Sequence, residues 1–295
     1  MLTQELIKKI RRIEIRTRRL VNASFAGEYH AIFKGRGIEF DEVRPYRPGD
    51  EVRTIDWNVS ARTGELYVKR YIEERELTVM LLVDASGSGQ FGTFNRFKRE
   101  IAAELAAVLA FSAISNNDKV GLLIFTDQVE LFIRPRKGRR HVLRLIRDLL
   151  AFQPTGRQTN LRLGLETLNH TLKRRSIIFL VSDFLASPDS YRSILQVSNR
   201  RHDVIAVTVS DPREQELPNV GLIALEDAET GQVQWVDTSN RKFRQAFAER
   251  VNELRLARER VFRKAKVDRI NISTASDYVI PLTNFFEQRA RRLRH

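Results

Sequence analysis

An aspartate and two serines at alternate positions, Asp84, Ser86 and Ser88, follow an apolar segment of strand length. This segment, residues 77–83, is rich in branched side chains, which predicts a strand buried on both faces in a parallel sheet. Open α/β sheets bind ligands just beyond the carboxyl ends of their strands. One carboxylate and two hydroxyls are hard oxygen ligands, which suit magnesium or manganese. The alternative for this triplet alone is a helix-capping turn, because Asp and Ser also precede helices.

Two more oxygen ligands fall where the predicted topology brings them near Asp84. Thr159 lies on a loop between two predicted helices, and Asp183 follows another buried strand, residues 176–181. The carboxyl ends of parallel strands meet at one edge of a sheet, so these side chains should lie together. We therefore expect one cleft, holding one Mg²⁺ or Mn²⁺, to be lined by Asp84, Ser86, Ser88, Thr159 and Asp183.

The elements that must position these residues follow from hydrophobic periodicity and from turn residues. The core, residues 76–210, alternates buried strands with amphipathic helices, and one strand, residues 129–133, reads as an antiparallel edge. This order predicts an α/β fold with a mostly parallel, Rossmann-like sheet and helices on both faces. The helices are expected over residues 94–115, 139–150, 159–173 and 190–199, and the other strands over 120–125 and 204–209.

Two smaller regions flank the predicted core. Residues 1–75 begin with a helix, residues 3–21, and continue as a small β-rich subdomain with a turn at 47–50. In that subdomain we expect a half-buried strand at Ile38 and Phe40, a turn at residues 34–37, and Trp57 as a packing anchor. Residues 211–295 predict a hairpin and helix extension: strands 222–225 and 233–236, a basic helix 240–266, a strand 270–273 and a helix from Leu282.

The five candidate ligands, in their order and on their elements, resemble the metal-ion-dependent adhesion site of a von Willebrand factor A domain. The resemblance covers residues 76–210 and implies that all five side chains bind the ion. The sequence departs from the family at Gly89, where a Met is frequent. That departure changes the packing under the loop and leaves the ligand set intact.

Both flanks resemble the family known as domain of unknown function 58, which carries a von Willebrand factor A-like core. The matching segments are residues 37–50, Ile55-Asp-Trp-Asn58, residues 71–74, residues 277–282 and Phe285-Phe286. This resemblance implies association with a MoxR-type AAA+ ATPase. Many members begin with transmembrane helices, and the first residues of this sequence favour the soluble form instead.

Composition limits the remaining possibilities. The sequence contains no cysteine, which excludes disulfides and thiolate catalysis and fits a cytoplasmic location. No apolar run approaches the ~18 residues of a membrane span. The net charge of +14 is concentrated in residues 8–19, 134–147 and 241–295. Binding of nucleic acid or another acidic partner there is one alternative function, but apolar residues interleave with the first cluster and no nucleic-acid module accompanies it.

The favoured function is a non-enzymatic, metal-dependent module that binds a carboxylate of a partner protein, such as a MoxR-type ATPase or its client. A metal-dependent hydrolase is the second alternative. A magnesium phosphotransferase of the haloacid-dehalogenase type would need a carboxylate at position 86, where this sequence has Ser86. A hydrolase nucleophile elbow centred on Ser88 would need glycine at that same position 86. None of the histidines has a triad-like context: His30, His141, His170, His202 and His295.

Overall fold

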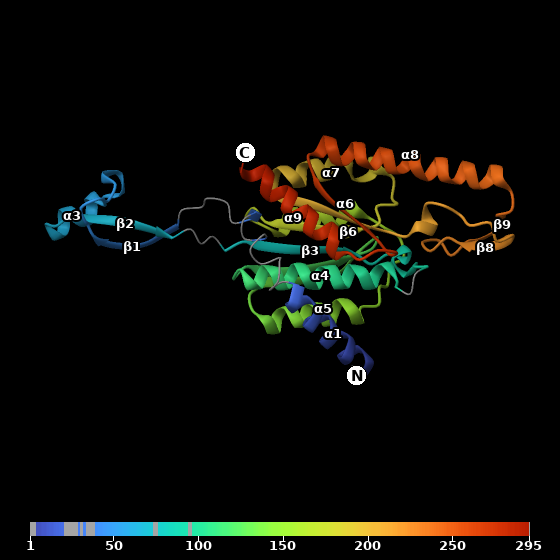
Figure 1. Cartoon of the computed structure of the whole chain (residues 1–295), viewed down its shortest axis with the longest axis horizontal. Helices are drawn as coiled ribbons and strands as arrows, with labels where there is room; N and C mark the ends of the chain where they lie inside the picture. Colours follow the sequence, from blue (N-terminus) through green and yellow to red (C-terminus); the bar gives the residue numbers. More distant parts are fainter. Residues whose placement is uncertain are drawn as a thin grey trace.

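A computed structural model describes residues 4–20, 29, 32–33, 39–72, 76–93 and 96–294. At its centre lies a six-stranded sheet in the order β10-β7-β6-β3-β4-β5 (Figure 1). The strands are β3 (Thr78–Asp84), β4 (Lys119–Phe125), β5 (Val129–Arg136), β6 (Ile177–Ser182), β7 (Asp203–Ser210) and β10 (Asp268–Ser273).

The strand order is that of a doubly wound sheet. Counted from β3 along the chain, the strands lie in the order 3-2-1-4-5-6, the Rossmann arrangement. Every neighbouring pair is parallel except β4 and β5, which are antiparallel at one edge. The predicted fold class and the antiparallel edge strand are therefore confirmed. The strand order reverses between β3 and β6, so the ends of these strands form the crevice in which such sheets bind ligands.

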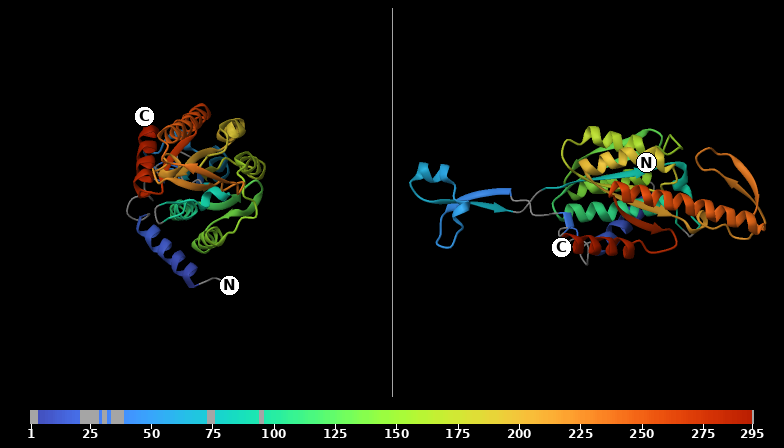
Figure 2. Two further views of the ribbon diagram at one scale, coloured as in Figure 1. Left: turned by 90° about the vertical axis from the view of Figure 1, so that its right-hand side faces the viewer. Right: turned by 90° about the horizontal axis from the view of Figure 1, so that it is seen from above.

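Alternate residues of β3 supply two separate cores. Val79, Leu81 and Val83 pack with helices α4 (Lys98–Ser115), α5 (Arg139–Ala151) and α9 (Val279–Arg294). Met80 and Leu82 point to the other face, which is covered by α6 (Leu161–Thr171), α7 (Pro188–Arg201) and α8 (Arg241–Ala265). Helices cover both faces of the sheet (Figure 2). Because successive side chains of a strand point to opposite faces, a strand covered on both faces needs a continuous run of apolar residues.

Helix α4 is buried on nearly all sides because it lies between the sheet and two other helices, α5 and α1 (Gln4–Leu20). Its first residue, Lys98, is also buried. The predicted start of this helix was too early: Phe97 is the residue before the first turn and is 47% exposed. Positions 94 and 95 lie outside the described residues.

The N-terminal β-rich unit contains the antiparallel pair β1 (Glu39–Pro45) and β2 (Tyr67–Ile72), with a short helix α3 (Trp57–Thr63) between them. The unit lies away from the sheet in Figure 1. The turn at 47–50 is present, closed by a bond from the Asp50 amide to the Arg47 carbonyl. The expected turn at 34–37 and Ile38 lie outside the described residues, whereas Phe40 lies in β1.

Trp57 is not a packing anchor, and that expectation is wrong. Its side chain is 64% exposed at the first position of α3, where Asp56 caps the helix through the amides of Asn58 and Val59. The buried apolar contacts of the unit come instead from Ile55 and Val68.

The chain beyond Asp211 returns to the central sheet. After the short turn η4 (Pro212–Glu214), the hairpin β8 (Leu222–Glu226) and β9 (Val233–Asp237) and the helix α8 precede β10. Strand β10 then pairs with β7 as the edge of the sheet, so the hairpin and α8 are inserted between two neighbouring strands. None of the helices in the described part of the chain could span a membrane.

Candidate functional site

Asp84 is the last residue of β3, and a tight turn brings Ser86 and Ser88 beside it. One carboxylate oxygen, Oδ1, accepts the Ser86 amide at 2.9 Å. A short 3₁₀ turn, η3 (Gly87–Gln90), follows and holds the Ser86 and Ser88 hydroxyl oxygens 3.1 Å apart. The turn therefore gathers one carboxylate and two hydroxyls at the carboxyl end of the central strand.

Asp183 follows the neighbouring strand β6 and lies at the same edge. The preceding residue, Ser182, donates its hydroxyl to Oδ2 of Asp84 at 2.6 Å, which links the two strand ends. Asp84, Ser86, Ser88 and Asp183 all line one cavity of about 20 Å³. A cavity of this size holds roughly one water molecule or one small ion.

Thr159 lies on the adjoining loop and does not line that cavity. The loop is bonded to the Asp84 turn, because the Gly87 amide donates to the Arg157 carbonyl at 2.9 Å. The Thr159 hydroxyl donates at 2.7 Å to Oε1 of Glu229, which lies in the turn of the β8–β9 hairpin. The structure thus places four of the five predicted ligands around one cavity and the fifth beside it, in contact with a different carboxylate.

The charges of the two aspartates affect each other. Burial, and then the nearby charge of Asp183, raise the pKa of Asp84 to about 6, although hydrogen bonds from Ser182 and Ser86 oppose the rise. A carboxylate in this situation gains stability from a cation placed between it and its neighbour.

Lys98 is a buried cation that the sequence analysis missed. Its ammonium lies 2.7 Å from Oδ2 of Asp183 and also contacts Glu214, and its side chain is 3% exposed. Burial lowers the pKa of Lys98, but the charges of Asp183 and Glu214 outweigh that effect and the net shift is upward. A signal was present in the sequence: a lysine in the first turn of a mostly apolar helix opposes the helix dipole, which favours an acidic partner for it.

The oxygen-bearing residues of this cavity suit a small divalent cation, because magnesium and manganese prefer carboxylate and hydroxyl oxygens. Lys98 and Arg99 line the same cavity, so an ion would have to share Asp183 with the Lys98 ammonium. Lys98 is the one direct cationic partner of Asp183 and Glu214 among the described residues, and Asp84 has no ion pair there. No cluster of three His, Asp or Glu side chains suited to a metal occurs in that part of the chain, so an ion would depend on the hydroxyls.

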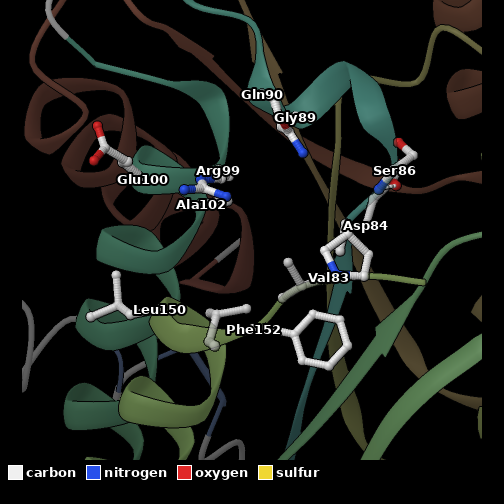
Figure 3. A pocket seen from close by; sticks show the side chains of 13 residues that line it. Val83, Asp84, Ser86, Gly89, Gln90, Arg99, Glu100, Ala102, Leu150 and Phe152 are labelled. Carbon is white, nitrogen blue, oxygen red and sulfur yellow. Dashed lines mark hydrogen bonds between the residues drawn. The ribbon is translucent and has the colours of Figure 1, made fainter. Parts of the chain in front are cut away.

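Two further hollows adjoin the Asp84 turn. On the side of α4 and α5, Val83, Leu150 and Phe152 form much of the wall of a cavity of about 70 Å³ that Asp84 and Ser86 also line (Figure 3). On the other side, a groove of about 610 Å³ runs from Ser88 to the hairpin. Its apolar wall comes from Phe91, Leu185, Leu217, Pro218, Ile223, Leu225 and Phe247. The candidate site is therefore open to larger partners on the hairpin side.

The basic clusters lie on separate elements, and many of their members pair with acids. Arg139 of α5 contacts Glu14 of α1. Arg289 of α9 contacts Asp203 and Asp268, the first residues of β7 and β10. A groove of about 420 Å³ runs along α1 and contains both basic and acidic side chains. Part of the positive charge is therefore used in ion pairs between elements of the fold.

Comparison with known proteins gives a family and several relatives. The family model described as protein of unknown function DUF58 matches residues 42–257. Uncharacterized proteins Mb1516 of Mycobacterium bovis and Rv1480 of Mycobacterium tuberculosis are each 31% identical over 289 residues, covering 97% of this chain and 90% of theirs. Uncharacterized protein YeaD of Bacillus subtilis is 29% identical over 107 residues, which is 36% of this chain and 25% of that protein.

Solved structures with similar coordinates include BatB from Bacteroides thetaiotaomicron, at 14% identity and a TM-score of 0.49, covering 73% of this chain and 99% of that one. The SpRpn10 VWA domain aligns at 10% identity and a TM-score of 0.39, covering 72% and 95%. Because these scores are low, the fold assignment rests on the strand order described above.

Proposed function

Because this chain belongs to the DUF58 family of proteins of unknown function, we propose that it is a non-enzymatic module that binds a partner protein through a divalent cation. The observation that supports this proposal is the cavity of about 20 Å³ shared by two strand-end aspartates, Asp84 and Asp183, and two hydroxyls. Ser86, Ser88 and Asp183 would hold Mg²⁺ or Mn²⁺, with Thr159 on the adjoining loop. Asp84 would act directly or through water.

The ligand chemistry indicates what such a site binds. Serine and threonine hydroxyls are neutral ligands, so a divalent ion held by them keeps much of its positive charge. A carboxylate is the abundant hard anion on protein surfaces, and an Asp or Glu side chain of a partner suits an open position on the ion. The groove beside Ser88 offers apolar surface for the residues around that carboxylate.

The histidines support a binding role over a catalytic one. His141 bonds to the Val120 carbonyl at the start of β4, and His202 bonds to the Ser176 amide just before β6. Both therefore lie at the opposite end of the strands from Asp84. His170 bonds within its own helix, to the Glu166 carbonyl. These three side chains serve the backbone, and no acid–base pair with Ser86 or Ser88 arises from them.

The partner in this proposal is a MoxR-type AAA+ ATPase or its client, and the compartment is the cytoplasm. The absence of cysteine supports a reducing compartment. The carboxylate of the partner would complete the ion's coordination, and the apolar groove would bind the flanking segment.

A pull-down against the cognate MoxR-type ATPase tests the proposal. Wild-type protein should recover the ATPase in magnesium, and chelator should release it. Asp84→Ala should lose recovery in both conditions. Asp189→Ala is the matched control, because Asp189 is an exposed aspartate at the start of α7 and its loss should change nothing. Equal recovery with and without chelator, for wild type and Asp84→Ala alike, would overturn the metal-bridged mechanism.

A further inference from the structure

The cavity of about 70 Å³ on the α4 and α5 side of the site combines an apolar wall with polar groups at one end. Val83, Leu150 and Phe152 belong to the wall, and Asp84 and Ser86 line it from the end of β3 (Figure 3). The space is several times what one water molecule needs, so an aliphatic side chain can enter it. This cavity can therefore hold an apolar group directly beside the strand-end aspartate.

Gly89 keeps this cavity open. It lines the cavity from the turn η3, and a Cβ atom added there would meet the Cβ atom of Arg99 at 3.8 Å, which is ordinary contact. Because Arg99 lines the same cavity, a longer side chain at position 89 would occupy part of it. The departure from methionine at this position, noted in the sequence, thus leaves space that a methionine would fill.

Arg99 is the exposed cation of this site. It lies in the first turn of α4 and lines both this cavity and the smaller one that Asp183 lines. Among the described residues no acidic side chain forms an ion pair with Arg99, whereas its neighbour Lys98 is buried and paired with Asp183 and Glu214. The planar guanidinium fork of Arg99 is therefore available to a carboxylate from outside the chain.

Two further charges act on an anion at this position. Helix α4 has 18 residues and begins at Lys98, so the partial positive charge of its first turn lies beside Arg99 and favours an anion. Asp84 opposes this effect, because its carboxyl pKa of about 6 leaves it mostly ionised at pH 7. A cation beside Asp84 would cancel that repulsion.

We propose that Arg99 binds the carboxylate of the partner, and that the cavity of about 70 Å³ receives the aliphatic side chain next to that carboxylate. The ligand is a peptide segment in which an aspartate or glutamate directly adjoins a residue such as leucine. This inference deepens the proposed function and rests on it for the partner's carboxylate. It does not need the ion, because the guanidinium itself holds the carboxylate.

Nuclear magnetic resonance of the full, ¹⁵N-labelled chain with blocked peptides tests the ligand class. In magnesium, acetyl-Leu-Asp-Leu-amide at millimolar concentration should shift the amides of residues 84–90, 99–102 and 149–152. Acetyl-Leu-Asn-Leu-amide should bind at least about tenfold more weakly, because a charge-assisted hydrogen bond is lost. Acetyl-Ala-Asp-Ala-amide should bind about tenfold more weakly, because it leaves the cavity unfilled.

Two pairs of variants test the two halves of the site with acetyl-Leu-Asp-Leu-amide. Arg99→Gln should weaken binding at least about tenfold. Arg140→Gln is its matched control, because Arg140 is an exposed arginine at the start of α5, at the other end of the sheet. Gly89→Met should abolish binding by filling the cavity, whereas Gly89→Ala adds only an ordinary contact and should bind like wild type.

Several results would overturn this inference. One is the absence of shifts at these amides in wild type, and another is equal binding of the Asp and Asn peptides. Wild-type binding by Arg99→Gln would remove the guanidinium from the site, and wild-type binding by Gly89→Met would remove the cavity from it.

The same titration in chelator separates this inference from the metal-bridged mechanism. Tighter binding in magnesium supports both, because the ion cancels the charge of Asp84. Equal binding in magnesium and in chelator, still lost in Arg99→Gln, supports the role of Arg99 and overturns the metal bridge. Magnesium-dependent recovery of the ATPase by Arg99→Gln at the wild-type level leaves the metal bridge standing and overturns the role of Arg99.

Discussion

Asp84 and Asp211 both lie at the carboxyl ends of strands of the central sheet, but their surroundings differ. Asp211 follows β7, is fully buried, and accepts four hydrogen bonds of 2.6 to 2.9 Å, two from Thr93 and one each from Thr274 and Arg213. Asp84 ends β3 and accepts two, from Ser86 and Ser182, while it faces another carboxylate. The donors of Asp211 join three separate segments of the chain, whereas those of Asp84 come from its own turn and the next strand.

The difference appears in the pKa of each carboxyl group. Burial raises the pKa of Asp211, but the hydrogen bonds from Thr274, Thr93 and Arg213 outweigh it and the net shift is downward. Burial and the charge of Asp183 raise that of Asp84 to about 6. The four hydrogen bonds of Asp211 stabilise its charged form within the fold, whereas Asp84, with two hydrogen bonds and a like charge beside it, gains from a nearby cation.

Removing the buried cation should have the largest effect on stability. Lys98→Met leaves the buried Asp183 and the half-buried Glu214 without their charge partner, and we expect a loss of about 3–5 kcal/mol in the free energy of unfolding. Urea unfolding followed by circular dichroism measures it. Lys98→Met combined with Glu214→Gln should recover part of the loss. A single variant as stable as wild type would show that the acids at this edge need no cation.

Removing the charge of Asp211 should cost somewhat less. Asp211→Asn replaces a carboxylate oxygen by a donor facing other donors, and we expect a loss of about 2–3 kcal/mol at pH 7. The folded pKa lies below the ordinary value of about 3.9, so the stabilisation is complete above that value and disappears as the pH falls through the folded pKa. The stability gap between variant and wild type should therefore narrow between pH 5 and pH 2. A gap independent of pH would contradict an ionised Asp211.

Ion binding should stabilise the protein through Asp84 and not through Asp211. At a free Mg²⁺ concentration ten times the dissociation constant, wild type should gain about 1.4 kcal/mol. Asp84→Asn should gain none, because the carboxylate that faces the ion is lost. Thermal unfolding with Mg²⁺ and with chelator measures the difference. Exposed Asp189→Asn should respond like wild type.

The smallest change is expected for Asp84→Asn without any ion. The variant weakens the bond from Ser182 but also removes the repulsion from Asp183, so these effects nearly cancel and the unfolding free energy should change by less than about 1 kcal/mol. Equilibrium unfolding in chelator, beside Asp211→Asn, makes the contrast direct. A loss as large as that of Asp211→Asn would show that Asp84 is a structural carboxylate after all.

Most of the fold could be predicted from local patterns. The apolar runs of β3, β4, β6 and β7 reveal strands covered on both faces, and the helical spacing between them reveals the crossover connections. Asp84 and Asp183 were identifiable because each directly follows such a run. The short helix α3 was missed although Asp56 before it and Gly64 after it, in the left-handed conformation, are ordinary helix boundaries.

The residues that sequence reasoning missed act through long-range pairs. Lys98 meets Asp183 and Glu214, which lie 85 and 116 positions away, and Thr159 meets Glu229 at a separation of 70. No periodicity connects such positions, because the fold alone brings them together. The bond between Thr159 and Glu229 also depends on a hairpin whose placement against Gly87 only the structure reveals.

The return of β10 to the sheet has a consequence for synthesis on the ribosome. Strand β7 lies between β6 and β10, and its partner is made only after the hairpin and all of α8. Until residue 273 has left the exit tunnel, β7 has an unpaired edge, and its apolar residues next to β10 lack their final neighbours. While the hairpin is being translated, a nascent chain of this protein therefore carries an unpaired strand edge that is prone to aggregation. Pairing of β10 with β7 removes that exposed edge.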